Sequence, residues 1–499
     1  MHKSDSATKP IVWTIASSDS GGGAGIQADL HTFNALECHG CSVIAAITAQ
    51  NSTEVVGYEA VSQALFVTQL NCLLHDMPPQ VIKIGLIPDA GLLEQLVAWL
   101  AQHKAEYQFI VIADPVLSSS SGYNFVRQST LSIWRHQLLP LLDLITPNLP
   151  ELALLSNLPH AEVESQAEQL LQWGAKAALI KGGHSSSTAD ITDQFISANN
   201  GFKLTQPRLS AVHNHGTGCV LSSAIAAACA HGYELTDSVI VGRAYLQQAL
   251  CHSYATGKGA GSLQHHGWPT ESHYFPQLKQ PQDTHYDALS FAATSAPIGF
   301  YPVVDSVQWL KRLLPFEPDV IQLRIKHGTA EEIEQQIAEA VVLSRDYKLR
   351  LFINDHWQLA IKYAAYGVHL GQEDLTVADL PAIAAAGLRL GISTHSYAEL
   401  LRARQLQPSY IALGHIFATQ TKQMPSQPQG LTRLKHYAAL CSNTPTVAIG
   451  GITAERLDAV LKCGVSGVAV VSAVTAQAEP EQAFSHLKHR VEQHYAHQA

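Results

Sequence analysis

The chain has 499 residues, of which 46% are hydrophobic and 14% are charged, a composition typical of soluble α/β proteins. This length exceeds what one hydrophobic core supports, so two or more domains are expected. The net charge of −10, without any basic run, argues against general binding to nucleic acid.

The N-terminus and the cysteines bear on the cellular compartment. Residues 1–10 are polar and lack the apolar core of a signal peptide, and no run of 18 apolar residues predicts a membrane span. Eight scattered cysteines favour a reducing environment, which predicts a cytoplasmic protein. Cys38 and Cys41 have the spacing of a redox or metal pair, but their apolar surroundings favour core packing.

After a polar tail, 1–9, residues 10–262 alternate apolar strands with helical stretches, which predicts a layered α/β domain. The first strand runs into the glycine-rich stretch 17–25, which is suited to mould around a ligand. Its spacing is not Gly-x-Gly-x-x-Gly, so a dinucleotide site is not predicted. The expected strands are Ile11–Ala16, Ser42–Ile47, Val81–Ile84, Phe109–Ala113, Asp143–Thr146 and Ala177–Lys181.

Charged residues follow three of these strands. Asp114 and Glu151 stand just past strand ends, where open α/β sheets bind ligands, so they are candidates for placing Mg²⁺ on a phosphate. Glu151 has an alternative role as a helix cap. Lys181 precedes two glycines and suits a polyphosphate.

The stretch His215-Gly-Thr-Gly-Cys219 precedes a run of small residues that reads as a helix. Gly216 and Gly218 would let backbone N–H groups form an anion site at the positive helix end. Cys219 at the helix start is expected to have a lowered thiol pKa and to accept a proton. The alternative is a glycine turn before a buried helix. Together with Asp114 and Lys181, the stretch favours a phosphotransferase.

Residues 263–296 are polar and contain prolines without periodicity, which predicts an inter-domain linker that can include some packed residues. From residue 297, eight strand–helix units in about 200 residues predict a (β/α)₈ barrel. The expected strands are Phe300–Val304, Val320–Leu323, Leu349–Ile353, Gly367–Leu370, Leu388–Ile392, Tyr410–Leu413, Thr446–Ile449 and Val468–Val471.

Polar residues gather after these strands, at the end where such barrels bind ligands. Glycine and serine after strands seven and eight predict a phosphate site, and the whole set suits an anionic leaving group held by cations and carboxylate-bound Mg²⁺. The set comprises Gln322, Arg324, Asn354, Asp355, His369, Ser393, Thr419, Thr421, Lys422, Gly450, Gly451 and Ser472.

The motifs of residues 10–268 resemble hydroxymethylpyrimidine (phosphate) kinase, which has the ribokinase-like fold. The matching stretches are Ser18–Asp29, Thr48–Asn51, Lys83–Gly85, Asp114–Val116, Thr146–Glu151, Lys181–His184 and His215–Cys219.

This resemblance implies Mg²⁺ and ATP as co-substrate, with Lys181 at the phosphates. Asp29, Gln50 and Val116 would bind the aminopyrimidine. Cys219 would be the base, with Gly216 and Gly218 in the anion hole. The sequence departs from the family pattern at Ser17, Leu86 and Ser120.

Residues 297–495 resemble thiamine-phosphate synthase. The matching stretches are Gln322–Lys326, Phe352–Asp355, Gly367–Asp374, Gly391–His395, Ala418–Lys422, Ile449–Ile452 and Val470–Ala473.

By this second resemblance, Asp355 and Asp374 would hold Mg²⁺, and Ser393 would lie near the pyrimidine. The diphosphate would be held by Gln322, Arg324, Lys326, Asn354 and Lys422. The thiazole phosphate would be held by Thr419, Thr421, Gly451, Val471 and Ser472. His415 and Ala418 replace prolines common in the family.

We therefore expect a bifunctional enzyme of thiamine biosynthesis. The first half would phosphorylate hydroxymethylpyrimidine twice, and the second would couple the diphosphate to thiazole phosphate, releasing pyrophosphate. Two alternatives stay open for the first half: a pyridoxal kinase, or a non-catalytic pyrimidine sensor. We expect small-molecule substrates alone, no membrane or nucleic acid, and a homodimer formed through the kinase half.

Overall fold

The computed structural model describes residues 8–117, 125, 127–184, 189–280, 289–419 and 427–497. The chain divides into two compact units. The first unit comprises residues 1–269 and 273–283, and the second comprises 270–272 and 284–499. Among the described residues, no helix has both the length and the apolar character needed to cross a membrane.

The first unit is built on a ten-stranded sheet with the order β10-β9-β8-β7-β6-β5-β4-β1-β2-β3. Its six parallel strands are those expected from the sequence. Six of the eight residues of β1 are buried, because helices cover both faces of a parallel sheet. These strands are β1 (Ile11–Ser18), β2 (His39–Gln50), β4 (Val81–Ile84), β5 (Ile110–Ala113), β6 (Leu144–Ile145) and β7 (Ala177–Ile180).

Four further strands extend the sheet through antiparallel pairs that the sequence did not predict: β3 (Val55–Ala60), β8 (Asp190–Ser197), β9 (Gly201–Pro207) and β10 (Gln277–Lys279). β10 lies inside the stretch 263–296 that was expected to be a linker. Residues 292 and 293 of the same stretch accept hydrogen bonds from Ser409 and Arg389 of the second unit. Much of the expected linker is therefore packed structure.

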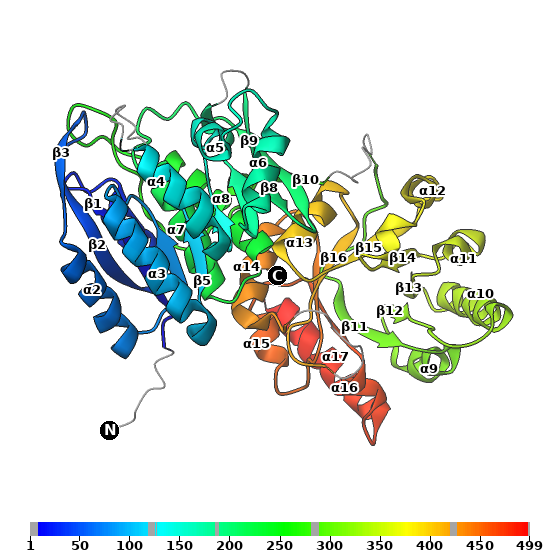
Figure 1. The fold of residues 1–499 in the computed structure, drawn as a ribbon. Helices are drawn as coiled ribbons and strands as arrows, with labels where there is room; N and C mark the ends of the chain where they lie inside the picture. The colour runs from blue at the N-terminus through cyan, green and yellow to red at the C-terminus, as the bar shows by residue number, and fades with distance from the viewer. Residues whose placement is uncertain are drawn as a thin grey trace, which may run out of the picture. The chain divides into compact units, whose positions relative to one another are not determined.

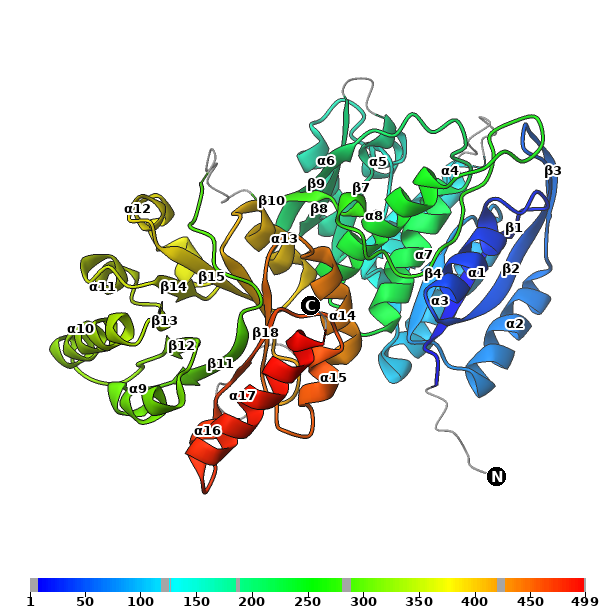
Figure 2. The ribbon, with the colours of Figure 1, turned by 180° about the vertical axis from the view of Figure 1, so that it is seen from behind.

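Helices cover both faces of the sheet (Figures 1 and 2). One layer holds α1 (Gly25–Ala35), α7 (Thr217–Ala230) and α8 (Leu235–Cys251), and the other holds α2 (Gln63–Asp76), α3 (Ala90–Tyr107) and α4 (Gln128–Ile133). α5 (Leu149–Ser156) and α6 (Val163–Gln172) follow β6. This three-layer architecture is the ribokinase-like fold expected from the sequence.

Local sequence explains where several helices begin. Asp89 caps α3 by accepting a hydrogen bond from Leu92 N at 2.9 Å. α7 is different, because its N-cap is Gly216 and eleven of its fourteen residues are buried. Small side chains let α7 pack closely against α1 and α8, so its start is held at a fixed place over the sheet.

The second unit is a closed barrel of eight parallel strands, which confirms the (β/α)₈ prediction. The strands are β11 (Gly299–Val304), β12 (Val320–Leu323), β13 (Arg350–Asn354), β14 (Gly367–Leu370), β15 (Arg389–Thr394), β16 (Tyr410–Leu413), β17 (Thr446–Ile449) and β18 (Gly467–Val470). The helices are α9 (Val307–Leu313), α10 (Ala330–Asp346), α11 (Trp357–Lys362), α12 (Leu380–Ala385), α13 (Tyr397–Gln405), α14 (Gly430–Leu440), α15 (Leu457–Leu461), α16 (Ser472–Thr475) and α17 (Pro480–Ala496).

Aromatic side chains fill the barrel. The ring centroids of Phe352 and Tyr410 lie 5.0 Å apart at 81°, and those of Tyr301 and Tyr410 lie 5.8 Å apart at 69°. These edge-to-face contacts make the interior a packed core. Ligands therefore have access only at a rim, and all eight parallel strands bring their carboxyl ends to the same rim.

Candidate active sites

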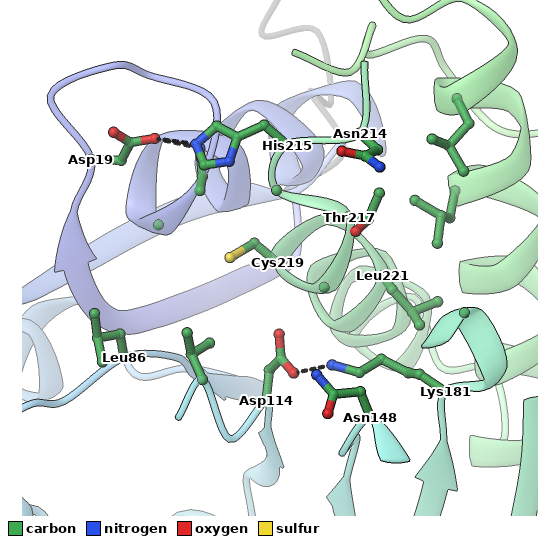
Figure 3. A pocket seen from close by; sticks show the side chains of 18 of the residues that line it. Asp19, Leu86, Asp114, Asn148, Lys181, Asn214, His215, Thr217, Cys219 and Leu221 are labelled. Atoms are coloured by element: carbon green, nitrogen blue, oxygen red, sulfur yellow. Dashed lines mark hydrogen bonds and ion pairs between the residues drawn. The ribbon is translucent and has the colours of Figure 1, made fainter. Parts of the chain in front are cut away.

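The first unit contains a cavity of about 620 Å³ at the carboxyl ends of its parallel strands. Side chains from the loops after β1, β4, β5 and β7 line it, together with the start of α7. Eight of the kinase-site residues expected from the sequence line this cavity: Gln50, Asp114, Val116, Glu151, Lys181, Gly216, Gly218 and Cys219. Figure 3 shows Asp114, Lys181 and Cys219 among them.

A cation and two carboxylates meet on one wall. Lys181 Nζ lies 2.6 Å from Asp114 Oδ1 and 3.6 Å from Glu151 Oε2. Burial would lower the pKa of the Lys181 ammonium, but the two carboxylates raise it overall, so Lys181 remains charged. Burial raises the pKa of Glu151, and Asp114 reinforces this shift while Lys181 opposes it. An added cation would therefore favour the ionised form of Glu151.

Glu151 also caps a helix, as the alternative interpretation held. Asn148 N donates to Glu151 Oε2 at 2.8 Å, and Glu151 N donates to Asn148 Oδ1 at 2.9 Å. This capping box fixes the carboxylate at the start of α5. The cap bond uses Oε2, the backbone N–H of Leu117 also hydrogen-bonds to this carboxylate, and the residue still lines the cavity.

Two glycines bring the start of α7 against the cavity wall. Gly216 has a φ of +81°, and a Cβ there would lie 2.0 Å from Gly23 O. A Cβ on Gly218 would lie 2.8 Å from Asp114 Oδ2 and 3.4 Å from Lys181 Nζ. Only glycine permits this approach. The first-turn N–H groups of α7, which have no partner within the helix, thus lie next to the Lys181–Asp114 pair.

Cys219 is on the first turn of α7, and its sulfur projects into the cavity (Figure 3). The sequence predicted a lowered thiol pKa, and this prediction is wrong. Burial raises the pKa of Cys219 to about 11, and Asp29 and Asp114 add to the effect against the opposing charge of Lys83. Desolvation outweighs the helix dipole, so the resting side chain is a thiol.

Asp29 was expected to bind the aminopyrimidine, but it does not line the cavity. Its side chain is fully buried against Lys83, and its two oxygens accept hydrogen bonds from Thr14 and Ser223. A carboxylate with every oxygen engaged below the surface is not available to bind a pyrimidine. In the sequence, Asp29 follows the glycine-rich stretch near the start of a helix, and this local position does not predict that the side chain is buried.

Asp19 and His215 also line the cavity and form a pair that the sequence did not predict. Asp19 Oδ2 lies 3.1 Å from His215 Nε2 and accepts hydrogen bonds from Gly23 N and Ala24 N. Gln50 Nε2 lies 3.3 Å from the same histidine nitrogen. Burial acts to raise the pKa of Asp19, but its hydrogen bonds, led by that of His215, lower it overall. Asp19 and His215 both belong to motifs visible in the sequence.

In the second unit, acidic residues pair at the carboxyl rim of the barrel. Lys326 Nζ forms an ion pair with Asp355, which follows β13 with a φ of +63°. Burial opposes the effect of Lys326, yet the pKa of Asp355 is lowered. Burial and the neighbouring Asp355 both raise the pKa of Asp374. Two adjacent carboxylates near one cation suit a divalent metal ion.

A hydrogen-bonded chain leads from the barrel core to this rim. Gln322 Nε2 donates to Tyr301 OH at 3.4 Å, and Tyr301 OH lies 2.9 Å from Tyr410 OH. His369 bridges Tyr410 OH at 2.7 Å and Ser393 Oγ at 2.8 Å. The sequence indicated Gln322, His369 and Ser393. It did not indicate the tyrosines, because an aromatic residue in a strand usually signals core packing.

The remaining rim residues lie where the strand count placed them. Asn354 ends β13, and Arg324 directly follows β12. Gly451 follows β17, and Val471 and Ser472 follow β18. Thr419 lies in the loop after β16. Thr421 and Lys422 lie outside the described residues, as does Ser120 of the first unit.

No group of three or more His, Cys, Asp or Glu side chains that could hold a metal ion exists within the described ranges. Mg²⁺ needs only one or two protein carboxylates when phosphate oxygens and waters complete its octahedron. Asp114 with Glu151, and Asp355 with Asp374, each fit this requirement.

Two classes of enzyme are thus combined in one chain: a ribokinase-like small-molecule kinase and a (β/α)₈ barrel enzyme with an anion-binding rim. Residues 19–264 match the family model of phosphomethylpyrimidine kinase, and residues 300–474 match that of thiamine monophosphate synthase.

Curated relatives match the barrel half. Thiamine-phosphate synthase of Serratia proteamaculans is 58% identical over 202 residues, covering 40% of this chain and 95% of that protein. The same enzyme of Proteus mirabilis is 56% identical over 203 residues, covering 41% and 94%.

Solved structures similar to this chain match the kinase half. A phosphomethylpyrimidine kinase of Clostridium difficile 630 is 34% identical, covering 48% of this chain and 99% of that one, with a TM-score of 0.42. A pyridoxal kinase of Staphylococcus aureus is 24% identical, covering 55% and 98%, with a TM-score of 0.49.

The chain belongs to the thiamine-phosphate synthase family and carries a phosphomethylpyrimidine kinase domain in front of the synthase. It is a bifunctional transferase of thiamine biosynthesis, as the sequence predicted. The kinase domain uses ATP to phosphorylate hydroxymethylpyrimidine, and the synthase domain forms thiamine phosphate.

Proposed function

We propose that Cys219 is the base of the kinase reaction and that Lys181 and the start of α7 hold the transferred phosphate. The single observation that carries this proposal is the convergence of Cys219, Lys181 and Asp114 on one cavity wall. The first-turn N–H groups and Lys181 would stabilise charge that develops on the phosphoryl oxygens. Gln50 and Val116 line the same cavity and would contact the pyrimidine.

Mg²⁺ would be held by Asp114 and Glu151, where it would neutralise phosphate charge. The donor chemistry of two carboxylates beside a phosphate-binding lysine supports this assignment. Lys181 Nζ, now bonded to Asp114, would contact the phosphate oxygens when ATP binds, and the helix cap would keep Glu151 in place.

In the synthase, Asp355 and Asp374 would hold a second Mg²⁺ beside the leaving pyrophosphate. Loss of pyrophosphate from an electron-rich pyrimidine methylene favours a cation-like path, so the rim must stabilise the leaving group. Gln322, Arg324, Lys326, Asn354 and Lys422 would hold the diphosphate, and Ser393 would contact the pyrimidine. Thr419, Thr421, Gly451, Val471 and Ser472 would hold the thiazole phosphate.

The test is a coupled assay in which pure protein receives hydroxymethylpyrimidine, ATP and thiazole phosphate, and thiamine phosphate is measured. Cys219→Ala should lower phosphorylation about 10²–10⁴-fold, because a general base is lost. Cys229→Ala is the matched control: Cys229 is also buried in α7 but does not line the cavity. Both variants should couple supplied diphosphate normally.

Wild-type phosphorylation by Cys219→Ala would refute the base assignment. Pyridoxal supplied in parallel measures the competing substrate, and we expect hydroxymethylpyrimidine to have the higher kcat/KM.

We also propose a cytoplasmic homodimer. All eight cysteines are free thiols, which supports a reducing compartment. β3 is an edge strand, and the β2–β3 hairpin exposes Ile47 at 60% and Val56 at 72%. Exposed apolar side chains on the edge strand β3 and on its neighbour β2 support association through the kinase half. Sedimentation of Val56→Asp, expected to be monomeric, against wild type tests this.

A further inference from the structure

The kinase domain contains a fully buried ion pair to which the mechanism above gives no role. Lys83 Nζ lies 2.9 Å from Asp29 Oδ1 and 2.8 Å from Asp29 Oδ2, and both side chains have 0% exposure. Removing two charges from water is costly, and an apolar pair of similar size is often as stable. A buried pair placed beside a reactive group therefore calls for a functional explanation.

The pair is held rigidly from two sides. Thr14 Oγ1 of β1 donates to Asp29 Oδ2 at 2.6 Å, and Ser223 Oγ of α7 donates to Asp29 Oδ1 at 2.7 Å. Asp29 thereby receives hydrogen bonds on both oxygens, one from β1 and one from α7. Lys83, which projects from β4, has its ammonium fixed in turn.

The geometry places this ammonium next to Cys219. Ser223 follows Cys219 by four residues on α7, so the two side chains share one helix face. Lys83 lines the same cavity as Cys219, whereas Asp29 lies behind it. The thiol and the ammonium therefore belong to residues of the cavity lining, and the carboxylate lies behind them.

Several charged and polar groups around Cys219 act on its thiolate form. Asp29 and Asp114 disfavour its thiolate form, while Lys83 and the backbone N–H of Gly25 favour it. Lys181 also interacts with the thiolate form, but the phosphate of ATP would bind Lys181 during the reaction. Burial acts to lower the pKa of Lys83, but the charge of Asp29 raises it overall, so Lys83 stays a cation within the protein interior.

We propose that Lys83 is a positioning residue of the kinase reaction, whose ammonium, oriented by Asp29, stabilises Cys219 as a thiolate. This proposal rests on the assignment of Cys219 as the base. The resting thiol first releases its proton to solvent, and the thiolate then takes the hydroxyl proton of the substrate while that oxygen bonds to the γ-phosphorus of ATP. The bond from this phosphorus to the β–γ bridging oxygen breaks, ADP leaves, and the thiol later returns its proton to solvent.

Three variants of the full chain separate this role from a structural one. Lys83→Met combined with Asp29→Asn removes both charges and leaves no unpaired buried ion. Asp29→Asn alone keeps the ammonium and removes the carboxylate that offsets it. Lys83→Arg keeps the cation and serves as the conservative rescue.

The first measurement is the alkylation rate of Cys219 by iodoacetamide at pH 8.5, quantified by mass spectrometry of its peptide. The rate is proportional to the thiolate fraction, and a nearby charge changes that fraction about 10-fold or more. We expect the double variant to slow alkylation about 10-fold, Asp29→Asn to accelerate it, and Lys83→Arg to leave it within about threefold. Cys229 in the same digest is the control for general loosening.

The second measurement is phosphorylation. The double variant should lower kcat about 10–100-fold with KM for ATP unchanged, and the loss should diminish as pH rises, because alkali restores the thiolate. Unchanged Cys219 alkylation, or equal shifts in the same direction for Asp29→Asn and the double variant, would overturn the proposal. Shifted alkylation with unchanged kcat would also overturn it.

The alkylation experiment does not depend on the base assignment. If Cys219→Ala keeps full kinase activity, the proposed base fails, whereas the alkylation rates still report whether Lys83 controls the thiol. The two failures are therefore distinguishable.

Discussion

Replacing Gly218 by alanine should impair phosphorylation without unfolding the protein. The new Cβ would lie 2.8 Å from Asp114 Oδ2 and 3.4 Å from Lys181 Nζ. Ordinary contact requires about 3.5 Å, so the Asp114 carboxylate must retreat by about 0.7 Å. It cannot do so freely, because Lys181 holds it at 2.6 Å.

A misplacement of about 1 Å at a reacting centre costs up to about 10²-fold in rate. We therefore expect kcat for hydroxymethylpyrimidine phosphorylation to fall about 10- to 50-fold. Alanine is favoured over glycine in a helix by up to about 1 kcal/mol, and this gain offsets part of the steric cost. The midpoint of thermal unfolding should consequently stay close to that of the wild type.

The assay follows ADP release by the full chain and, separately, coupling of supplied diphosphate. Gly183→Ala is the matched control, since Gly183 lines the same cavity but a Cβ there would have nothing within 4 Å. Coupling should be normal in both variants. If Gly218→Ala phosphorylates at the rate of Gly183→Ala, the close approach of α7 to Asp114 does not matter for phosphate transfer.

Three other predictions concern the synthase, the two units and pH. Asp374→Ala should block coupling while phosphorylation continues, so the pyrimidine diphosphate accumulates in chromatographic assays. The control Asp379→Ala, which removes only a helix cap, should couple normally. Equal coupling rates for the two variants would contradict the metal role of Asp374. Chains ending at Gln280 and starting at residue 289 should be separately active, and their mixture should form thiamine phosphate at nearly the intact rate; inactivity of either piece would show that the units depend on each other. Burial acts to raise the pKa of Asp143, but hydrogen bonds and charge from Lys104 lower it overall. The ionised carboxylate therefore stabilises the folded state above the pKa that Asp143 has in the unfolded chain. This stabilisation is lost as the pH falls through the pKa that Asp143 has in the folded protein. Asp143→Asn should therefore destabilise the kinase unit by about 2 kcal/mol at pH 7 and by much less near pH 3, measured as the urea midpoint of kinase activity; an equal loss at both pH values would refute the linkage.

The sequence by itself determined the architecture of both units. Apolar strands such as Phe109–Ala113 and Tyr410–Leu413 are continuous apolar runs, and buried parallel strands are recognised by that local pattern. Most of the kinase cavity was also predictable, because Asp114, Lys181 and Gly218 each follow a strand or begin a helix. Parallel strands bring such positions to one edge whatever the details of packing.

Only the tertiary structure decided the properties that depend on many distant residues at once. The antiparallel strand β10 follows a polar stretch, and its pairing with β9 is set by the edge of a sheet formed elsewhere in the chain. Asp29 was expected at the ligand, but Thr14, Lys83 and Ser223 from three other elements enclose it. The pKa of Cys219 was mispredicted for the same reason: a helix start is a local feature, whereas desolvation and the field of surrounding charges are sums over the whole fold.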